Sequence, residues 1–304
     1  MKTISVFGVF VADLCFIANA IPEKGQTILG SHHIVGPGGK GSNQAIAVAK
    51  LNGKVNFLTK IGNDKNGEMA LNLYKSLGMG IASIIQDKNH STGVAGIMVN
   101  EKTGDNAINI IPGAAGTLTN DDIEKNLNFI ANTDIFLTQL ETPYDVTKYA
   151  LKKAKEKKLT TILNPAPACQ INDDDFKLID FFTPNETEAE FYLNKKIETE
   201  KDIKIASEEF LKKGIKNIVI TLGEKGCYFA NDKENFFMNA FKLKEPVVDT
   251  TGAGDAFNGA LAVGLSKDLD IKEVLTFANK VGAISTTKQG AAASMPSMED
   301  LNNY

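Results

Sequence analysis

The chain has 304 residues, of which 43% are apolar, so it can bury a large core in one domain or in a large and a small one. Its formal net charge of −4, with no stretch that gathers Lys and Arg without acidic neighbours, argues against a nucleic-acid-binding surface. No apolar run approaches the ~18 residues that span a membrane, and three cysteines without paired spacing indicate neither disulfides nor zinc, so we expect a cytoplasmic protein.

The N-terminal part of the chain begins with a core strand and continues with runs that fit no strand-helix alternation. Ile4 to Phe10 is predicted as a buried strand, and Asp13 after it is either a turn residue or a ligand-binding carboxylate. Four further strand-like runs are Cys15 to Asn19, Thr27 to Val35, Gly93 to Val99 and Ala107 to Ile111. We assign them to a small β lid made of residues 14–35 and 91–111, inserted into a core of residues 1–13, 36–90 and 112–304.

A glycine-rich segment, Gly36-Pro37-Gly38-Gly39-Lys40-Gly41, leads into a predicted helix over Ser42 to Leu51. It formally fits the G-x-G-x-x-G pattern, but it follows a lid strand and not the first strand of a βαβ unit, so we assign no dinucleotide site. A Walker A loop is also absent, because Lys40 is followed by Gly41. We interpret the glycines as a hinge that lets the backbone approach a sugar, with Lys40 and Asn43 as donors. A flexible turn before a helix is the alternative.

The middle of the chain predicts a parallel sheet covered by helices. A strand at 55–58 and a helix at 68–77 come first; strands at 135–139, 161–163, 181–183 and 217–221 then alternate with helices at 145–157, 186–193 and 202–213. Such sheets bind ligands beyond the carboxyl ends of their strands. Polar or backbone-exposing residues follow four of the strands: Glu141, Asn164, Asn185 and Thr221-Leu222-Gly223. Four in succession indicate a binding site more than four separate helix caps.

The C-terminal run Asp249 to Ala260 places two glycines and Asp255 at the start of a buried helix. The first turn of a helix has N–H groups without internal partners, so Gly252, Ala253 and Gly254 can hold a phosphate or a developing negative charge. A carboxylate beside such a site repels the anion that the site attracts, which points to Asp255 as a base that takes a proton from a hydroxyl. Taken alone, a Gly-Asp pair before an apolar helix is more typical of an N-cap.

Four motifs resemble the signatures of the ribokinase-like family of sugar and nucleoside kinases, in the family's order and across nearly the whole chain. They are Gly38-Gly39-Lys40-Gly41-Ser42-Asn43-Gln44-Ala45, Asn164-Pro165-Ala166-Pro167-Ala168, Thr183-Pro184-Asn185-Glu186-Thr187-Glu188-Ala189-Glu190 and Asp249-Thr250-Thr251-Gly252-Ala253-Gly254-Asp255-Ala256. The second and third resemble the ribokinase branch more than fructokinases or adenosine kinases. The resemblance implies a three-layer α/β fold, with a mostly parallel central sheet flanked by helices and a small inserted β-sheet lid.

The resemblance also implies ATP-dependent phosphorylation of the O5 hydroxyl of D-ribose, giving D-ribose 5-phosphate, with Asp255 as the general base. The residues implied at the sugar are Val11, Ala12, Asp13, Gly39, Lys40, Gly41, Asn43, Glu141 and Asp255. Those implied at the nucleotide are Asn185, Thr221, Leu222, Gly223, Glu224, Lys225, Gly226, Gly254, Asp255 and Asn279.

Two metal ions are implied by the same resemblance. Mg²⁺ would be held by Asn185 and Glu188, directly or through water, although Glu188 also fits a first-turn helix acid. A monovalent cation, K⁺, would be enclosed by Asp249, Thr251, Ser285, Lys288, Gly290 and Ser294. Thr251 and Ser285 could instead be ordinary packing residues.

One departure from the family pattern leaves the substrate open. Some ribokinases carry a polar residue two positions before the aspartate at the first strand, where this chain has Val11. An apolar wall rejects an analogue that lacks a hydroxyl only poorly. 2-Deoxyribose therefore competes with D-ribose as the expected substrate, and fructose, a keto-deoxy sugar acid or a nucleoside are further alternatives.

Two other classes of protein and one partner complete the expectations. A non-catalytic sugar sensor would need no base, so Asp255 argues against it, and a dinucleotide-dependent oxidoreductase has only the discounted glycine pattern in its favour. The open sheet face of the lid predicts a homodimer that forms through the lid. No partner besides a sugar, ATP and a second copy of the chain is expected.

Overall fold

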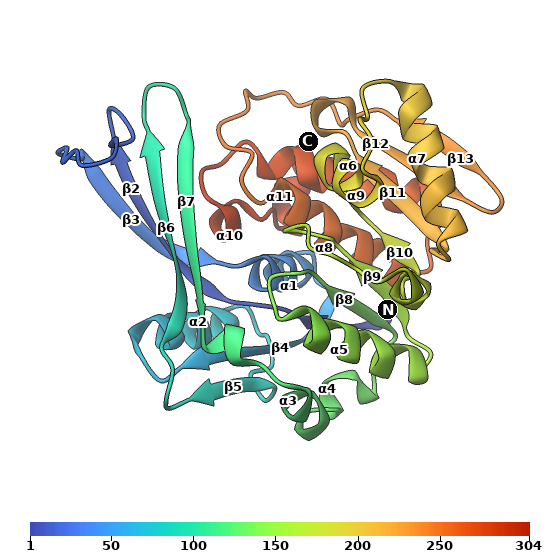
Figure 1. Ribbon diagram of the computed structural model, residues 1–304, viewed down its shortest axis with the longest axis horizontal. Helices are drawn as coiled ribbons and strands as arrows, with labels where there is room; N and C mark the ends of the chain where they lie inside the picture. The colour runs from blue at the N-terminus through green and yellow to red at the C-terminus, as the bar shows by residue number, and fades with distance from the viewer.

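The computed structural model describes residues 1–304 and contains a nine-stranded and a four-stranded sheet (Figure 1). The nine strands lie in the order β13-β12-β11-β10-β9-β8-β1-β4-β5, and all neighbours are parallel except at β12 and β13. Most of the parallel strands are short apolar runs, as expected for a sheet that is covered on both faces. Their bounds are β1 Thr3–Phe7, β4 Lys54–Gly62, β5 Ile84–Asp87, β8 Ile135–Thr138, β9 Thr160–Leu163, β10 Phe181–Phe182, β11 Asn217–Thr221, β12 Cys227–Asn231 and β13 Asn235–Met238.

Helices cover both faces of this sheet and separate its core into layers. On one face a cluster of 35 buried residues joins the sheet to α1 (Lys40–Lys50), α2 (Lys65–Ser76), α8 (Ala253–Ser266) and α9 (Ile271–Ser285). On the other face two further clusters involve α3 (Asn120–Lys125), α4 (Asn128–Ala131), α5 (Tyr144–Glu156), α6 (Glu186–Leu193) and α7 (Glu200–Lys212). The predicted three-layer α/β fold is thus confirmed. None of the helices is long and apolar enough to cross a membrane.

Short elements connect these layers. They are the 3₁₀ helices η1 (Ala114–Thr117), η2 (Asp173–Leu178) and η3 (Gly223–Lys225), and the C-terminal helices α10 (Ala291–Ser294) and α11 (Met298–Asn302). Helix α10 follows the loop after α9, and Gly252 at the start of α8 packs against its first residue, Ala291. The C-terminal segment therefore lies beside the predicted anion site.

Helix α8 is buried along almost its whole length and packs closely on α1. A Cβ added to Gly259 would lie 2.6 Å from Cβ of Ala47 and 3.1 Å from the carbonyl oxygen of Gln44, both on α1. Real Cβ atoms do not approach this closely, so only glycine permits the observed spacing. This close packing brings the first turns of α1 and α8 together, although the two helices are far apart in sequence.

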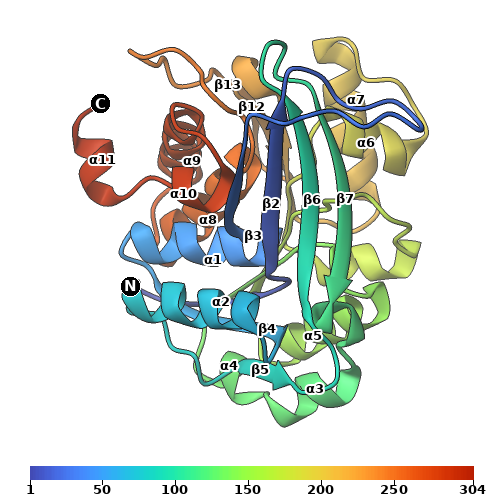
Figure 2. The same cartoon turned by 90° about the vertical axis from the view of Figure 1, so that its left-hand side faces the viewer.

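The four-stranded sheet is the predicted lid and stands beside the core (Figures 1 and 2). Its strands are β2 Val11–Ala18, β3 His32–Gly38, β6 Thr92–Asn100 and β7 Asn106–Gly113, in the order β3-β2-β6-β7. The pairs β2–β3 and β6–β7 are antiparallel, whereas β2 and β6 run parallel. The lid thus consists of two excursions of the chain from the core, one between β1 and α1 and one between β5 and η1. The parallel pairing of β2 with β6 joins the two.

Two strand predictions, one in the core and one in the lid, were wrong in their bounds. The strand predicted at Ile4 to Phe10 ends at Phe7, and the next strand already begins at Val11. Asp13 therefore lies inside a lid strand and not at the end of a core strand. The strand predicted at Thr27 to Val35 spans His32–Gly38, since only these residues pair with β2. The antiparallel pair β12 and β13 at the sheet edge was not predicted.

Asp64 fastens the lid to the core. Its carboxylate caps helix α2 by accepting the backbone N–H of Gly67, and it also accepts both the backbone N–H and the hydroxyl of Thr92, each at 2.7 Å. Thr92 is the first residue of lid strand β6. The backbone N–H of Gly62 donates a buried hydrogen bond to the hydroxyl oxygen of Thr92 at 2.9 Å, which completes the junction. The second excursion of the lid is consequently anchored to the start of α2.

Candidate active site

The predicted site residues meet where several elements end. Asn164 directly follows β9, Asn185 follows β10 by three residues, and Thr221 ends β11, so they share the carboxyl edge of the sheet. The first turns of α1 and α8 point to the same edge, because close packing at Gly259 holds them together. This is the edge at which open parallel sheets bind their ligands.

Asp255 is the buried centre of the site. It stands in the first turn of α8 and is 5% exposed. Its Oδ2 accepts a hydrogen bond from Nδ2 of Asn43 at 2.9 Å, and its Oδ1 accepts one from Nε2 of Gln44 at 2.9 Å. Asn43 was predicted as a sugar ligand, whereas Gln44 was not assigned a role. Both carboxylate oxygens of Asp255 are thus held by amides from the first turns of α1.

Backbone donors surround this carboxylate. Gly252 precedes α8 with φ of 79°, a left-handed conformation that suits glycine. The N–H groups of Gly252, Gly254 and Asp255 donate to no acceptor in the chain, whereas the N–H of Ala253 donates to the carbonyl of Thr250 at 3.2 Å. Ala253, which was predicted to contribute to the anion site, therefore offers no free donor. Space for a Cβ at Gly254 is open, so a ligand can approach its backbone.

Asp13 lies on the lid strand β2 and faces Asp255. Its carboxylate rests directly on Gly38 of β3, where an added Cβ would lie 2.1 Å from Oδ1 of Asp13. Burial, and secondly the charge of Asp255, raises the pKa of Asp13 to about 6. Ala12 was also predicted at the sugar, but it lies on the opposite face of β2 and its side chain is fully buried. Only the neighbouring residues on the face of Asp13 can contact a ligand through their side chains.

An apolar wall lies beside Asp13 on the same face of the lid, which we call the inner face. In the pairing of β2 with β6, Asp13 lies opposite Ala95 and Cys15 lies opposite Ile97. Val11 packs with Ala95 in one small buried cluster, against which Ile97 packs. Val11 was predicted here from its departure from the family pattern, but Ala95 and Ile97 were missed. Their position depends on the β2–β6 pairing, which no local pattern reveals.

Lys40 and Glu141 form the other side of the candidate sugar site. The backbone N–H of Lys40 donates to Oε2 of Glu141 at 2.7 Å. Burial raises the pKa of Glu141 to about 7, although Lys40 opposes this shift. Burial alone would lower the pKa of the Lys40 ammonium, but the carboxylates of Asp255, Glu141 and Glu188 hold it above its ordinary value. Lys40 therefore stays charged in the midst of the acidic groups.

Gly39 and Gly41 allow a close contact within the chain. A Cβ on Gly39, which has φ of 87°, would lie 2.7 Å from the carbonyl oxygen of Val9. A Cβ on Gly41 would lie 2.6 Å from the backbone of Gly8. These glycines were predicted as a hinge beside the sugar. In the structure they let the start of α1 pack on the connection between β1 and the lid, which sets the position of Lys40.

The residues predicted for Mg²⁺ form a capping box at the start of α6. Oδ1 of Asn185 accepts the N–H of Glu188 at 2.8 Å, and Oε2 of Glu188 accepts the N–H of Asn185 at 2.9 Å. This is the helix-acid geometry that the sequence left open for Glu188. Burial, and to a smaller extent the charge of Asp255, raises the pKa of Glu188, with Lys40 opposing it. The other carboxylate oxygen of Glu188, Oε1, takes no part in this capping box.

The predicted nucleotide loop lies next to this capping box. Thr221 pairs with Asn185 in a short parallel bridge, and its N–H donates to the carbonyl of Pro184. The loop turns through Gly223 and Gly226, both with positive φ, while Glu224 and Lys225 are exposed and Leu222 is buried. Asn279 of α9 approaches the end of the loop, where its Nδ2 contacts Sγ of Cys227 at 3.5 Å.

The predicted cation loop is closed by Asp249. Its Oδ1 accepts the N–H of Thr251 and its Oδ2 accepts the N–H of Gly290, each at 2.9 Å, which ties the segment before α8 to the segment after α9. Burial would raise the pKa of Asp249, but these hydrogen bonds hold it below its ordinary value. The hydroxyls of Ser285 and Ser294 donate to carbonyls within their own helices. The ammonium of Lys288 forms an ion pair with Asp300 at 2.7 Å.

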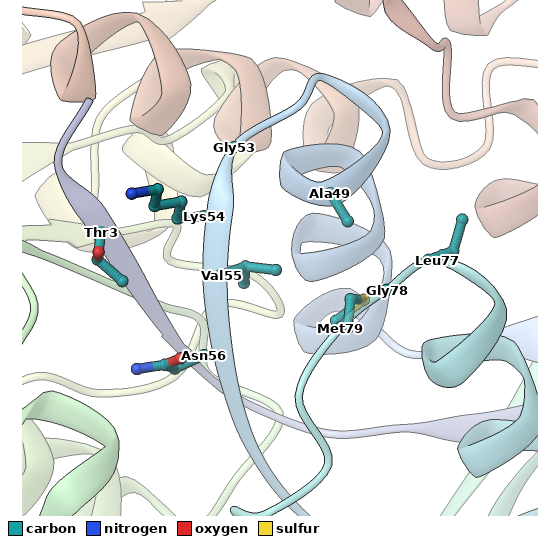
Figure 3. A pocket seen from close by; sticks show the side chains of 9 residues that line it. All are labelled: Thr3, Ala49, Gly53, Lys54, Val55, Asn56, Leu77, Gly78 and Met79. Carbon is teal, nitrogen blue, oxygen red and sulfur yellow. The ribbon is translucent and has the colours of Figure 1, made fainter.

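A separate cavity of about 420 Å³ lies at the opposite edge of the sheet (Figure 3). It is lined by the first residues of β1 and β4, the end of α1 and the turn after α2, including Lys54, Leu77 and Met79. None of the predicted site residues lines it. Because it lies at the amino ends of the strands, it is not where this architecture binds its ligands.

The whole chain resembles known carbohydrate kinases. Residues 1–298 match the model of the pfkB family carbohydrate kinases. The ribokinase of Haemophilus influenzae is 35% identical over 303 residues, which cover 100% of this chain and 98% of that protein. The deoxyribokinase of Salmonella typhi is 35% identical over 302 residues, covering 99% and 98%. The structure of Arabidopsis thaliana ribokinase with ribose and ATP matches with a TM-score of 0.90 at 28% identity, covering 99% and 98%.

Proposed function

The chain belongs to the pfkB family of carbohydrate kinases, and on this premise we propose that it transfers the γ-phosphoryl group of ATP to the O5 hydroxyl of D-ribose, giving ADP and D-ribose 5-phosphate. The observation that carries the proposal is the buried Asp255 beside the free N–H groups of Gly252 and Gly254. A binding protein without catalysis has no use for a carboxylate at the anion-binding turn of a helix. A relative at 35% identity over the whole chain is a ribokinase, which supports ribose as the acceptor.

Asp255 would act as the general base of this transfer. It accepts the proton of the O5 hydroxyl while O5 forms its bond to phosphorus and the bond from phosphorus to ADP breaks. A carboxylate is a much weaker base than an alkoxide, so the proton moves late, as bonding to phosphorus acidifies the hydroxyl. The free N–H groups at the start of α8 stabilise the charge on the transferring group.

The sugar would be held between the lid and the core. The carboxylate of Asp13 is suited to accept hydrogen bonds from the hydroxyl groups of a furanose, and Asn43 and Glu141 offer further hydrogen-bond partners. Asn43 has an Oδ1 that is buried without a hydrogen-bond donor, so a hydroxyl that donates to it would satisfy an otherwise unpaired acceptor. Lys40 supplies positive charge toward the sugar and the transferring phosphoryl group.

ATP and its Mg²⁺ would occupy the loop from Thr221 to Gly226 and the start of α6. The bridge between Thr221 and Asn185 supports this arrangement, since it joins the nucleotide loop to the proposed Mg²⁺ residues. Asn185 and Glu188 each use a side-chain oxygen as a hydrogen-bond acceptor in the capping box. They therefore fit a metal that is held through water better than one that is bound directly. Mg²⁺ when bound would neutralise phosphate charge, and Asn279 would lie toward the adenine.

K⁺ is proposed as a monovalent activator in the loop closed by Asp249. The loop is linked to Gly290 and lies directly before the anion-binding turn, so a cation there could tune that turn without touching substrate. The hydroxyls of Ser285 and Ser294 are committed to helix carbonyls, which leaves Asp249 and backbone carbonyls as the fitting ligands. The ammonium of Lys288 is engaged with Asp300, so only its backbone would contribute.

2-Deoxyribose is the second candidate substrate, and one observation favours it. The inner face beside Asp13 is walled by Val11, Ala95 and Ile97, none of which can hydrogen-bond a sugar hydroxyl. A site that offers no hydrogen-bond partner to one sugar hydroxyl discriminates only weakly against a sugar that lacks this hydroxyl. The Salmonella deoxyribokinase is as similar to this chain as the Haemophilus ribokinase is.

The deciding experiment measures ADP release from ATP and Mg²⁺ with D-ribose, 2-deoxyribose, fructose and adenosine in parallel, each with and without K⁺. We expect ribose to give the highest kcat/KM, with deoxyribose next and a rise in rate on adding K⁺. Asp255→Asn should abolish turnover while calorimetry still detects sugar binding, and Asp13→Ala should raise the KM for the sugar steeply. No ADP release with any sugar would contradict the proposal.

A homodimer is proposed through the outer face of the lid, the face opposite Asp13. Phe16, Val35, Met98 and Ile111 are 51%, 47%, 43% and 57% exposed, and pairing along the strands places all four on that face. Two copies of this apolar face could cover one another about a two-fold axis. Sedimentation at micromolar concentration should give the dimer mass for the wild type and the monomer mass for Phe16→Lys. A monomeric wild type would contradict the proposal.

A further inference from the structure

A chain of buried amide side chains runs from the sheet to the carboxylate of Asp255. Nε2 of Gln139, directly after β8, donates to Oε1 of Gln44 at 2.6 Å. Nε2 of Gln44 donates both to Oδ1 of Asp255 at 2.9 Å and to Oδ1 of Asn164 at 3.1 Å. Gln44, Gln139 and Asn164 are 0%, 1% and 6% exposed, so no bulk water competes for these bonds.

The charge of Asp255 fixes the direction of every bond in this chain. An ionised carboxylate only accepts, so Gln44 must turn its NH₂ group toward Asp255 and its carbonyl toward Gln139. Gln139 must then turn its own NH₂ group toward Gln44, which leaves Oε1 of Gln139 buried without a donor. An unpaired buried acceptor is costly. The carbonyl of Gln139 thus has no donor within the chain, while Gln44 keeps the orientation that the carboxylate of Asp255 requires.

A second branch of the network reaches the anion-binding turn. Nδ2 of Asn164 donates to the carbonyl of Thr183 at 3.2 Å, and the hydroxyl of Thr183 donates to Oδ1 of Asn258 at 2.7 Å. Nδ2 of Asn258 in turn donates to the carbonyl of Gly254 at 2.9 Å. One network thus connects the carboxylate of Asp255 to the backbone that carries the free N–H of Gly254.

We propose that Gln44 is a positioning residue that holds Oδ1 of Asp255, so that Oδ2 is the oxygen that receives the proton of the sugar hydroxyl. This inference rests on the proposed phosphoryl transfer. Gln44 approaches Oδ1 from inside the protein, whereas Oδ2 is bound by Asn43, which belongs to the candidate sugar site. Gln44 is fully buried and contacts no substrate, so it acts only through Asp255.

The first test is the variant Gln44→Met, which keeps the length of the side chain and removes the donor. We expect kcat for ribose to fall about 100-fold, because a catalytic base that is displaced by about 1 Å loses its alignment with the hydroxyl. The dissociation constant of ribose, measured by calorimetry without nucleotide, should stay close to that of the wild type. An equal loss in affinity, or an unchanged kcat, would overturn the proposal. An inactive wild type would instead refute the proposed function.

The second test separates positioning from packing through Gln44→Glu, which has nearly the same shape. When protonated, this side chain can donate to Oδ1 of Asp255 and accept from Gln139, as glutamine does; when ionised, it repels Asp255. We therefore expect the ratio of its kcat to that of the wild type to rise as the pH is lowered from 8 to about 5. For Gln44→Met the same ratio should not change with pH.

Other charged groups face Asp255 and titrate in both enzymes. They are Asp13 on β2, Lys40 on α1, Glu141 after β8 and Glu188 on α6. Their effect appears in wild type and variant alike, so it largely cancels in the ratio. A ratio for Gln44→Glu that stays far below one at every pH, down to pH 5, would overturn the proposal even if Gln44→Met failed to fold.

Discussion

Sugar binding should weaken as the pH falls, because two carboxyl groups with raised pKa values line the proposed sugar site. The pKa of Asp13 is raised to about 6, chiefly by burial, and that of Glu141 to about 7 by burial against the opposing charge of Lys40. Each must be ionised to accept a sugar hydroxyl with both oxygens. Affinity for D-ribose should therefore be full at pH values above both pKa values and decline as the pH passes through 7 and then 6.

The size of this effect follows from the ionised fractions. A carboxyl with a pKa of about 6 is about one-tenth ionised at pH 5, so Asp13 alone weakens binding about tenfold, or about 1.4 kcal/mol. Glu141, with a pKa of about 7, is about one-hundredth ionised at the same pH and weakens binding by up to about 100-fold. If ionisation of both groups is required, the combined loss between pH 8 and pH 5 reaches about 1000-fold.

Calorimetric titration of ribose without nucleotide, between pH 5 and pH 8, measures this dependence directly. Repeating it in buffers with different ionisation enthalpies should reveal proton release on binding near neutral pH. Glu141→Gln should remove the step near pH 7. Asp255→Asn should move the Asp13 step to lower pH, since it deletes a charge that raises this pKa. An affinity that stays constant or rises as the pH falls, with the circular dichroism spectrum unchanged, would refute the reasoning.

Three substitutions test the packing that shapes the site. Gly38→Ala should raise the KM for ribose about tenfold or more, because the new Cβ displaces the carboxylate of Asp13. Gly36→Ala on the same strand, where a Cβ meets nothing within 4 Å, should leave the KM unchanged. Equal KM values for the two variants would argue against the Gly38 contact. Asp64→Ala removes the acceptor of three donors at the lid junction, and urea unfolding should show a loss of about 1–3 kcal/mol; a loss within error would contradict this. Gly259→Ala should push α1 away from α8, which should lower the free energy of unfolding by about 1–3 kcal/mol and lower kcat as well. Wild-type kinetics in this variant would show that the helix spacing is not critical.

Local patterns were sufficient to predict the layers of the fold and the position of Asp255. Strand-helix alternation predicted the parallel sheet, and the glycines before an apolar helix predicted the helix start with free N–H groups that α8 displays. Both depend on residues that are close in sequence. The N-cap alternative for Asp255 does not describe the structure, because Gly252 is the N-cap and Asp255 lies in the first turn.

Contacts between distant segments were the part that the sequence did not reveal. Gln44 bonds Asp255 across 211 positions, and only the close packing of α1 on α8 at Gly259 makes that bond possible. The placement of Ala95 and Ile97 beside Asp13 likewise depends on the register of β2 with β6. The strand error at Ile4 to Phe10 has a local cause, because apolar residues continue from β1 into β2 and only Gly8 marks the break.

The parallel pairing of β2 with β6 also determines when the lid can assemble during synthesis of the chain. Val11 pairs with Gly93, so the β2–β3 hairpin emerges from the ribosome long before its partner strand exists. Until then one edge of β2 is unpaired, and the intervening α1, β4, α2 and β5 must fold to bring the two excursions together. We therefore expect the lid to form late in folding. In refolding from urea, the recovery of ribose binding should lag behind the recovery of helical circular dichroism.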